Sequence, residues 1–198
     1  DRAGCDAFCD YKLKVWSAPV SDLNNWQCHG DSFHTAPDYD HESDTSEWTD
    51  RELYAPDVVC KDGKYYLYAY IVGSRGCVGV SDKPEGPFTL LSRYKYDESD
   101  AGDEGIFNDA GVLVDDDGRV YIYYGFEKSH MNELNPDNMY EIVKGSYKAD
   151  VIPPGMEDDD FFEASSPRKV GDKYYLIYSP RKGSRLFYAI ADNPYGPF

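Results

Sequence analysis

The chain has 198 residues, enough for one sizeable hydrophobic core, so we expect one domain or part of one. It carries 37 acidic and 20 basic residues, a formal net charge of −17, which argues against nucleic-acid or anionic-membrane partners because phosphate binding needs clustered Lys and Arg. No apolar run approaches the roughly 20 residues of a bilayer-spanning helix. We therefore expect a neutral ligand, with no nucleic-acid and no membrane partner.

Five cysteines are spread along the chain without the paired spacing that zinc sites favour, and we expect mostly free, buried thiols. The chain begins with Asp1 and not with Met, so a targeting segment, if there is one, is not visible in it. The cellular location is therefore undetermined from the sequence, with a cytoplasmic location favoured over a secreted one.

The first segment, residues 1–50, contains "LKVWSAPVSDLNNWQCHG", which we interpret as the outer half of a β-sheet unit. Three β-hairpins follow, "VVCKDGKYYLYAY", "VLVDDDGRVYIYYG" and "RKVGDKYYLIYS", with turns at Gly63, Gly118 and Gly171. Each has an Asp-Gly or Gly-Asp turn between alternating aromatic and apolar residues, the pattern of a tight two-residue connection. A third strand is predicted after two of them, at "GCVGVS" and "LFYAIA".

The turn glycines recur at spacings of 55 and 53 residues, and "GPF" ends both "SDKPEGPF" and "ADNPYGPF". A repeat of about 50 residues with three or four antiparallel strands is typical of a β-propeller blade. The predicted fold class is all-β. We assign the outer half of blade one to residues 1–50, blade two to 51–100, blade three to 101–155 and blade four to 156–198, roughly three and a half blades of a partial β-propeller domain.

An acidic residue stands near the entrance of each predicted inner strand: Asp57 in "YAPDVV", Asp109 in "FNDAGV" and Glu163 in "FFEASSP". Each has an ordinary interpretation as a strand-end carboxylate that accepts backbone hydrogen bonds, and for Asp57 this is at least as good as a functional one. Asp109 and Glu163 converge from adjacent blades beside aromatic residues, which favours function. Paired carboxylates facing a neutral ligand suit glycosidic-bond hydrolysis, in which a protonated acid donates to the leaving oxygen and another carboxylate activates water.

The three motifs "YAPDVVCKDGKYYLYAY", "FNDAGVLVDDDGRVYIYYG" and "FFEASSPRKVGDKYYLIYS" resemble the second, third and fourth blades of glycoside hydrolase family 43. The resemblance implies a five-bladed propeller that acts with inversion on arabinose- or xylose-containing oligosaccharides and polysaccharides. It implies Glu163 as the general acid and Asp109 as the carboxylate that tunes the pKa of the acid and orients it. Asp57, Tyr54 and Phe107 are the predicted substrate-binding residues; Tyr54 replaces the usual Trp of its motif.

In that family the general base lies on the innermost strand of the first blade, upstream of anything matched here, and neither Asp1 nor Asp10 qualifies. We therefore expect the 198-residue chain alone to be inactive. No metal and no cofactor are assigned, although a complete propeller leaves room for a structural cation. Two alternatives stay open: a retaining propeller glycosidase that cleaves fructosides, and a non-catalytic carbohydrate-binding propeller. The exact sugar, its linkage, exo or endo action and the oligomeric state are undetermined.

Overall fold

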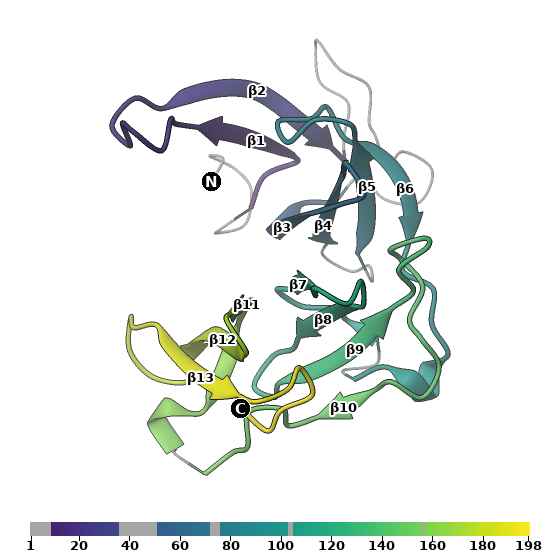
Figure 1. Ribbon diagram of the computed structural model, residues 1–198, viewed down its shortest axis with the longest axis vertical. Coiled ribbons are helices and arrows are strands. Elements are labelled where there is room, and N and C mark those ends of the chain that lie inside the picture. The colour runs from purple at the N-terminus through teal and green to yellow at the C-terminus, as the bar shows by residue number, and fades with distance from the viewer. Residues whose placement is uncertain (1–8, 36–50, 72–75, 103–104, 156) are drawn as a thin grey trace.

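The computed structural model describes residues 9–35, 51–71, 76–102, 105–155 and 157–198 (Figure 1). The described residues contain four antiparallel sheets, and their helical segments are short 3₁₀ turns, among them η1 (Glu98–Asp100) and η3 (Glu157–Asp159). The predicted all-β class is therefore confirmed. Cys5 lies outside the described residues; of the others, Cys9 and Cys77 are buried as expected, whereas Cys28 and Cys60 are exposed, which corrects the expectation of buried thiols.

The sheets follow the chain in order. The first pairs β1 (Lys12–Ser17) with β2 (Gln27–His34). The second has the order β3 (Leu53–Lys61), β4 (Lys64–Ile71), β5 (Cys77–Ser81) and β6 (Thr89–Arg93). The third runs from β7 (Gly111–Val114) through β8 (Val120–Tyr124) and β9 (His130–Leu134) to β10 (Lys148–Ala149), and the fourth comprises β11 (Phe161–Val170), β12 (Lys173–Pro180) and β13 (Phe187–Ala191).

The hairpins form where the glycines predict them. Asp62 and Gly63, between β3 and β4, both have positive φ, 51° and 76°, as the two central residues of a type I′ turn require. Gly171, with φ of 61°, lies in a second two-residue connection, between Val170 and Lys173. Gly118, with φ of 85°, lies in the five-residue connection between Val114 and Val120, which corrects the predicted two-residue turn at that hairpin. Because these turns match the right-handed twist of the flanking strands, each pairs two neighbouring strands in a fixed register.

Adjacent sheets pack face to face around an arc, with β3, β7 and β11 on its inner side and β6 and β10 outside (Figure 1). The hydrophobic core is divided among the spaces between sheets. Tyr68 and Val78 of the second sheet join Val112 and Ile122 of the third, and Tyr123 of the third joins Leu176 and Tyr178 of the fourth. This is the arrangement of a β-propeller, in which each blade buries its faces against its neighbours.

The inner strands leave a central space. A cavity of about 350 Å³ lies between β3, β7 and β11, and its lining includes Val59, Val112 and Pro167. At one end of these strands lie the hairpin turns, and at the other end lie their entrances with Asp109 and Glu163, whereas Asp57 lies further along β3, level with Val112. The fold therefore brings distant acidic segments together around a common axis.

Candidate active site

The entrances of the three inner strands share an unusual backbone conformation. Ala55, Asp109 and Ala164 each have a positive φ, 39°, 47° and 63°, which is strained for a residue with a side chain. These positions are 54 and 55 residues apart, so they are equivalent points of the repeat. The pairing of β3 with β4 shifts register next to Ala55, and that of β11 with β12 shifts next to Ala164. Such irregularities concentrate at functional sites and re-aim the side chains beside them.

Asp109 and Glu163 lie together, as predicted. The backbone N–H of Ala164, the residue after Glu163, donates a hydrogen bond to the Asp109 carboxylate. Burial raises the pKa of Glu163, and the negative charge of Asp109 raises it further. Burial also raises the pKa of Asp109, but the hydrogen bond from Ala164 opposes that effect. The pKa values of both carboxyl groups are therefore raised, that of Glu163 by burial and by the charge of Asp109, and that of Asp109 by burial.

The two strands that carry this pair approach each other very closely. A Cβ atom on Gly111 of β7 would lie 2.2 Å from the carbonyl oxygen of Ser165 and 2.5 Å from Cδ of Pro167, both on β11. Only glycine fits that gap, because any side chain would push the strands apart. Gly111 therefore brings Asp109 and Glu163 within reach of each other.

Asp57 has a different setting. Its Oδ2 accepts the backbone N–H of Val112 on β7 at 2.8 Å, and its Oδ1 accepts the N–H of Val58 at 2.9 Å. Burial raises the pKa of Asp57, opposed by these two hydrogen bonds and by the charge of Arg168. Asp57 thus joins β3 to β7 at a point three residues beyond Asp109, and the structure gives it a role in holding the inner strands together. Its contact with substrate stays a prediction.

Two tyrosine rings lie beside the carboxylate pair. Tyr54 and Tyr70 are opposite each other on β3 and β4, with ring centroids 6.0 Å apart in an edge-to-face arrangement. Burial raises the pKa of Tyr70, and the charge of Asp109 adds to it, so the two side chains are near neighbours. Tyr70 was not predicted as a site residue: the register shift between Tyr54 and Asp57 brings it opposite Tyr54, and a regular hairpin would have put Ile71 there.

The prediction that Phe107 contacts the substrate is corrected by its position. The side chain is only 1% exposed, and its ring packs against Tyr94 and Tyr124 with centroid separations of 4.4 Å in both cases. Two flanking sheets have closed over this ring. Phe107 is therefore a core residue that supports the loop leading to Asp109.

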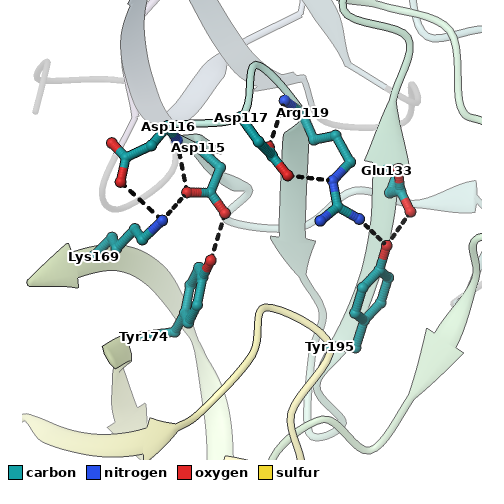
Figure 2. Close-up of polar contacts among 8 residues, drawn as sticks. All are labelled: Asp115, Asp116, Asp117, Arg119, Glu133, Lys169, Tyr174 and Tyr195. Atoms are coloured by element: carbon teal, nitrogen blue, oxygen red, sulfur yellow. Dashed lines mark hydrogen bonds and ion pairs between the residues drawn. The ribbon is translucent and has the colours of Figure 1, made fainter. Parts of the chain in front are cut away.

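A polar cluster joins β7 and β11 at their other end, near the hairpin turns. Figure 2 shows Asp115 facing Lys169 and Tyr174, with Lys169 also 2.9 Å from Asp116. The Asp115 side chain is only 3% exposed. Burial alone would raise the pKa of Asp115, but the hydrogen bonds from Lys169 and Tyr174 outweigh it and hold that pKa below its ordinary value.

A second polar cluster in Figure 2 connects the same two sheets further out. The Tyr195 hydroxyl, from the loop after β13, donates to Glu133 of β9 and accepts from Nη1 of Arg119 at 3.1 Å. Arg119 is in turn held by Asp117 at 2.8 Å. These two clusters therefore add polar contacts to the apolar interface between the third and fourth sheets.

We expect Lys169→Met to lower the midpoint of thermal unfolding by a few degrees at neutral pH, since it leaves the buried Asp115 carboxylate without its cationic partner. The Asp115 pKa is lowered in the folded state, so its stabilising effect is present above the ordinary aspartate pKa of about 4 and is lost as the pH falls below it. The difference in unfolding midpoint between Lys169→Met and the wild type should therefore become smaller at acidic pH.

The matched control is Lys173→Met, which removes an ion pair with Asp192 whose carboxylate is 83% exposed. Lys173→Met should leave the midpoint of thermal unfolding almost unchanged, as is usual when an exposed ion pair is removed. A double-mutant cycle with Asp115→Asn measures the coupling between Asp115 and Lys169. Additive effects of Lys169→Met and Asp115→Asn, or an equal loss with Lys173→Met, would contradict the assignment of this pair.

The described residues contain no group of three or more His, Cys, Asp and Glu side chains placed to hold a metal ion. Within the same ranges, no helix has the length and apolar character to cross a membrane.

The comparisons with known proteins point to one family. The model of the glycosyl hydrolases family 43 matches residues 7–198. A xylosidase/arabinosidase of Thermoclostridium stercorarium is 34% identical over an alignment that covers 98% of this chain and 44% of that protein. A β-xylosidase of Xylanibacter ruminicola is 33% identical, with 76% and 56% covered. This chain spans about half the length of these curated relatives.

Solved structures agree with this similarity. A β-xylosidase/α-arabinofuranosidase of family 43 from a compost microbial metagenome, solved in complex with xylotriose, superposes with a TM-score of 0.71 at 26% identity. The superposition covers 98% of this chain and 66% of that one. The fold described above is therefore similar to that of this enzyme.

Proposed function

This chain belongs to the glycosyl hydrolases family 43, and on that premise we propose that the protein hydrolyses O-glycosidic bonds of arabinose- or xylose-containing oligosaccharides or polysaccharides, with inversion at the anomeric carbon. One observation carries the proposal: Asp109 and Glu163 come from neighbouring inner strands, and the charge of Asp109 raises the pKa of Glu163. A carboxyl group that stays protonated beside an ionised one is what acid-catalysed cleavage of a glycosidic bond requires.

In this proposal Glu163 is the general acid. Its proton passes to the glycosidic oxygen as the bond to the anomeric carbon breaks, so that the leaving group departs as a neutral alcohol. A water molecule attacks from the opposite face and loses a proton to a base carboxylate, which we do not assign to any described residue. The mechanism requires no cofactor.

Asp109 acts on Glu163 in two ways. Its negative charge disfavours ionisation of Glu163, and its hydrogen bond to the N–H of Ala164 holds the backbone beside Glu163 in its strained conformation. Tyr54 and Tyr70 supply aromatic surface beside the pair, suited to the C–H faces of a sugar ring. Asp57 completes the proposed substrate-binding set.

The sugar class rests on the relatives. The curated proteins similar to this chain are named as a xylosidase/arabinosidase and a β-xylosidase, and the similar metagenome enzyme was solved with xylotriose. A neutral pentose-containing chain also suits a protein with a net charge of −17, which would repel anionic ligands.

The test uses the full-length protein with 4-nitrophenyl β-D-xyloside and 4-nitrophenyl α-L-arabinofuranoside. We expect hydrolysis of at least one of them, and proton NMR of the first product should show the anomer opposite to that of the substrate. A retained anomer would instead indicate a double displacement, as in the fructoside-cleaving alternative. Binding of xylo-oligosaccharides or arabino-oligosaccharides without any hydrolysis would indicate a non-catalytic carbohydrate-binding propeller.

A further inference from the structure

The two peptide groups on either side of Glu163 are each hydrogen-bonded to the neighbouring third sheet or its loops. On one side, the carbonyl oxygen of Phe162 accepts the backbone N–H of Glu127, from the loop between β8 and β9, at 2.7 Å. On the other side, the N–H of Ala164 donates to the Asp109 carboxylate. The two soft backbone torsions of Glu163 lie between these planar groups, so the two bonds together fix the direction in which its side chain leaves the strand.

These bonds carry weight because the pairing of β11 with β12 is irregular around Glu163. The register shifts both between Phe161 and Glu163 and between Glu163 and Ser166. The regular ladder to β12 is thus interrupted on both sides of the proposed acid. The constraint on its backbone comes in large part from the third sheet, through Asp109 and through Glu127.

The loop between β8 and β9 also reaches the segment before Asp109. The N–H of Gly125 donates to the carbonyl oxygen of Asn108 at 3.0 Å. A Cβ atom on Gly125 would lie 1.9 Å from a backbone carbonyl oxygen of the same loop, so this tight turn requires glycine. The loop is therefore bonded to the residue that precedes Asp109 and to the residue that precedes Glu163, and it links the two strand entrances.

Glu127 is held in place by Arg181, the first residue after β12. Glu127 has a positive φ of 59°, a strained conformation that persists where neighbouring contacts impose it. Nη1 of Arg181 lies 3.2 Å from Oε1 of Glu127, and the backbone N–H of Arg181 donates to the carbonyl oxygen of Asp160 at 2.9 Å. Arg181 therefore connects the end of β12, the segment that enters β11 and the loop that carries Glu127.

We propose that Glu127 and Arg181 are positioning residues for the reaction: their ion pair holds the peptide group between Phe162 and Glu163, and so aims the Glu163 carboxyl group at the glycosidic oxygen. The inference rests on the proposed function. In this role neither side chain contacts the substrate. Neither charge contributes to the raised pKa of Glu163, which comes from burial and from Asp109, so the effect is one of geometry.

The test compares, in the full-length protein, whichever of xylotriose and arabinotriose the wild type hydrolyses with the 2,4-dinitrophenyl glycoside of the same sugar. Arg181→Met and Glu127→Ala should each lower kcat on the trisaccharide by roughly three- to fivefold, because a poor leaving group depends on an aligned proton donor. The kcat on the dinitrophenyl glycoside and both KM values should change by less than twofold, and the basic limb of the pH–rate profile should stay in place. Glu127→Gln, which keeps an oxygen that accepts from Arg181, should retain most of the activity.

Arg185→Met is the matched control. It makes the same change in the same loop, at an ion pair with Asp159 of 2.9 Å, but the pairing of Phe161 with Pro180 lies between that contact and Glu163. Arg185→Met should leave kcat on both substrates unchanged. Circular dichroism confirms that each variant is folded. Combining Glu127→Ala with Arg181→Met should cost no more than either change alone, since both remove the same ion pair.

Unchanged kcat on the trisaccharide, equal losses of kcat on both substrates, or the same loss with Arg185→Met would overturn the positioning role. A raised KM would also overturn it, because it would indicate that these side chains contact the sugar. Those results would leave the proposed function standing, since hydrolysis of the 4-nitrophenyl glycosides by the wild-type protein tests that separately. A wild-type protein without any hydrolysis would remove both the proposed function and the positioning role.

Discussion

Glu163→Gln in the full-length protein is expected to lower kcat on xylo-oligosaccharides or arabino-oligosaccharides by roughly 100- to 10,000-fold, with little change in KM. Glutamine has the shape of the acid but no acidic proton, so the leaving sugar would have to depart as an alkoxide. A substrate with an acidic leaving group, such as a 2,4-dinitrophenyl glycoside, needs less protonation and should lose much less activity.

The informative measurement is the loss of kcat on an oligosaccharide divided by the loss of kcat on a dinitrophenyl glycoside. Steady-state kinetics on an oligosaccharide and on a dinitrophenyl glycoside give that ratio directly. Glu141→Gln is the matched control, since it makes the same change at a carboxylate that accepts a hydrogen bond from Asn138 in an exposed loop. An equal, small loss on both substrates would show that Glu163 is not the proton donor.

Asp109→Asn is expected to lower kcat by roughly 100-fold and to move the basic limb of the pH–rate profile to lower pH. The direction of this shift in the basic limb follows from the electrostatics of Glu163. Burial and the charge of Asp109 both raise the pKa of Glu163, so removing the charge lowers that pKa while burial still acts. At a pH above this lowered pKa, Glu163 is protonated in fewer molecules, and only those molecules can donate the proton that cleavage needs. The asparagine carbonyl still accepts from the N–H of Ala164, so the local backbone should persist.

Asp57→Asn provides the comparison. It removes the same charge from the middle of another inner strand, but Asp57 does not contribute to the raised pKa of Glu163. This variant should therefore leave the position of the basic limb unchanged, whatever it does to stability through the bond to Val112. An unshifted profile with near-normal turnover for Asp109→Asn would mean that Asp109 serves only as a strand-entrance residue.

The sequence alone was sufficient to predict the hairpins and the propeller class. Gly63, Gly118 and Gly171 occupy turns with positive φ, and alternating side chains on either side of each turn specify which faces are buried. These are local effects, because a short turn sets the register of the two strands that it joins. The repeat spacing of these turns then indicated that Asp109 and Glu163 would meet at one end of the axis, and the structure brings them together.

Only the tertiary structure decided what surrounds that pair. Phe107 is buried because two neighbouring sheets close over it, and Tyr70 approaches Asp109 because a register shift in β3 changes the hairpin pairing. Asp57 bonds to Val112, and the ring of Phe126 packs against that of Phe162, in each case across the boundary between two consecutive sheets. Hairpin registers depend on a few adjacent residues, whereas strand irregularities and contacts between sheets depend on how whole sheets pack, which no single motif encodes.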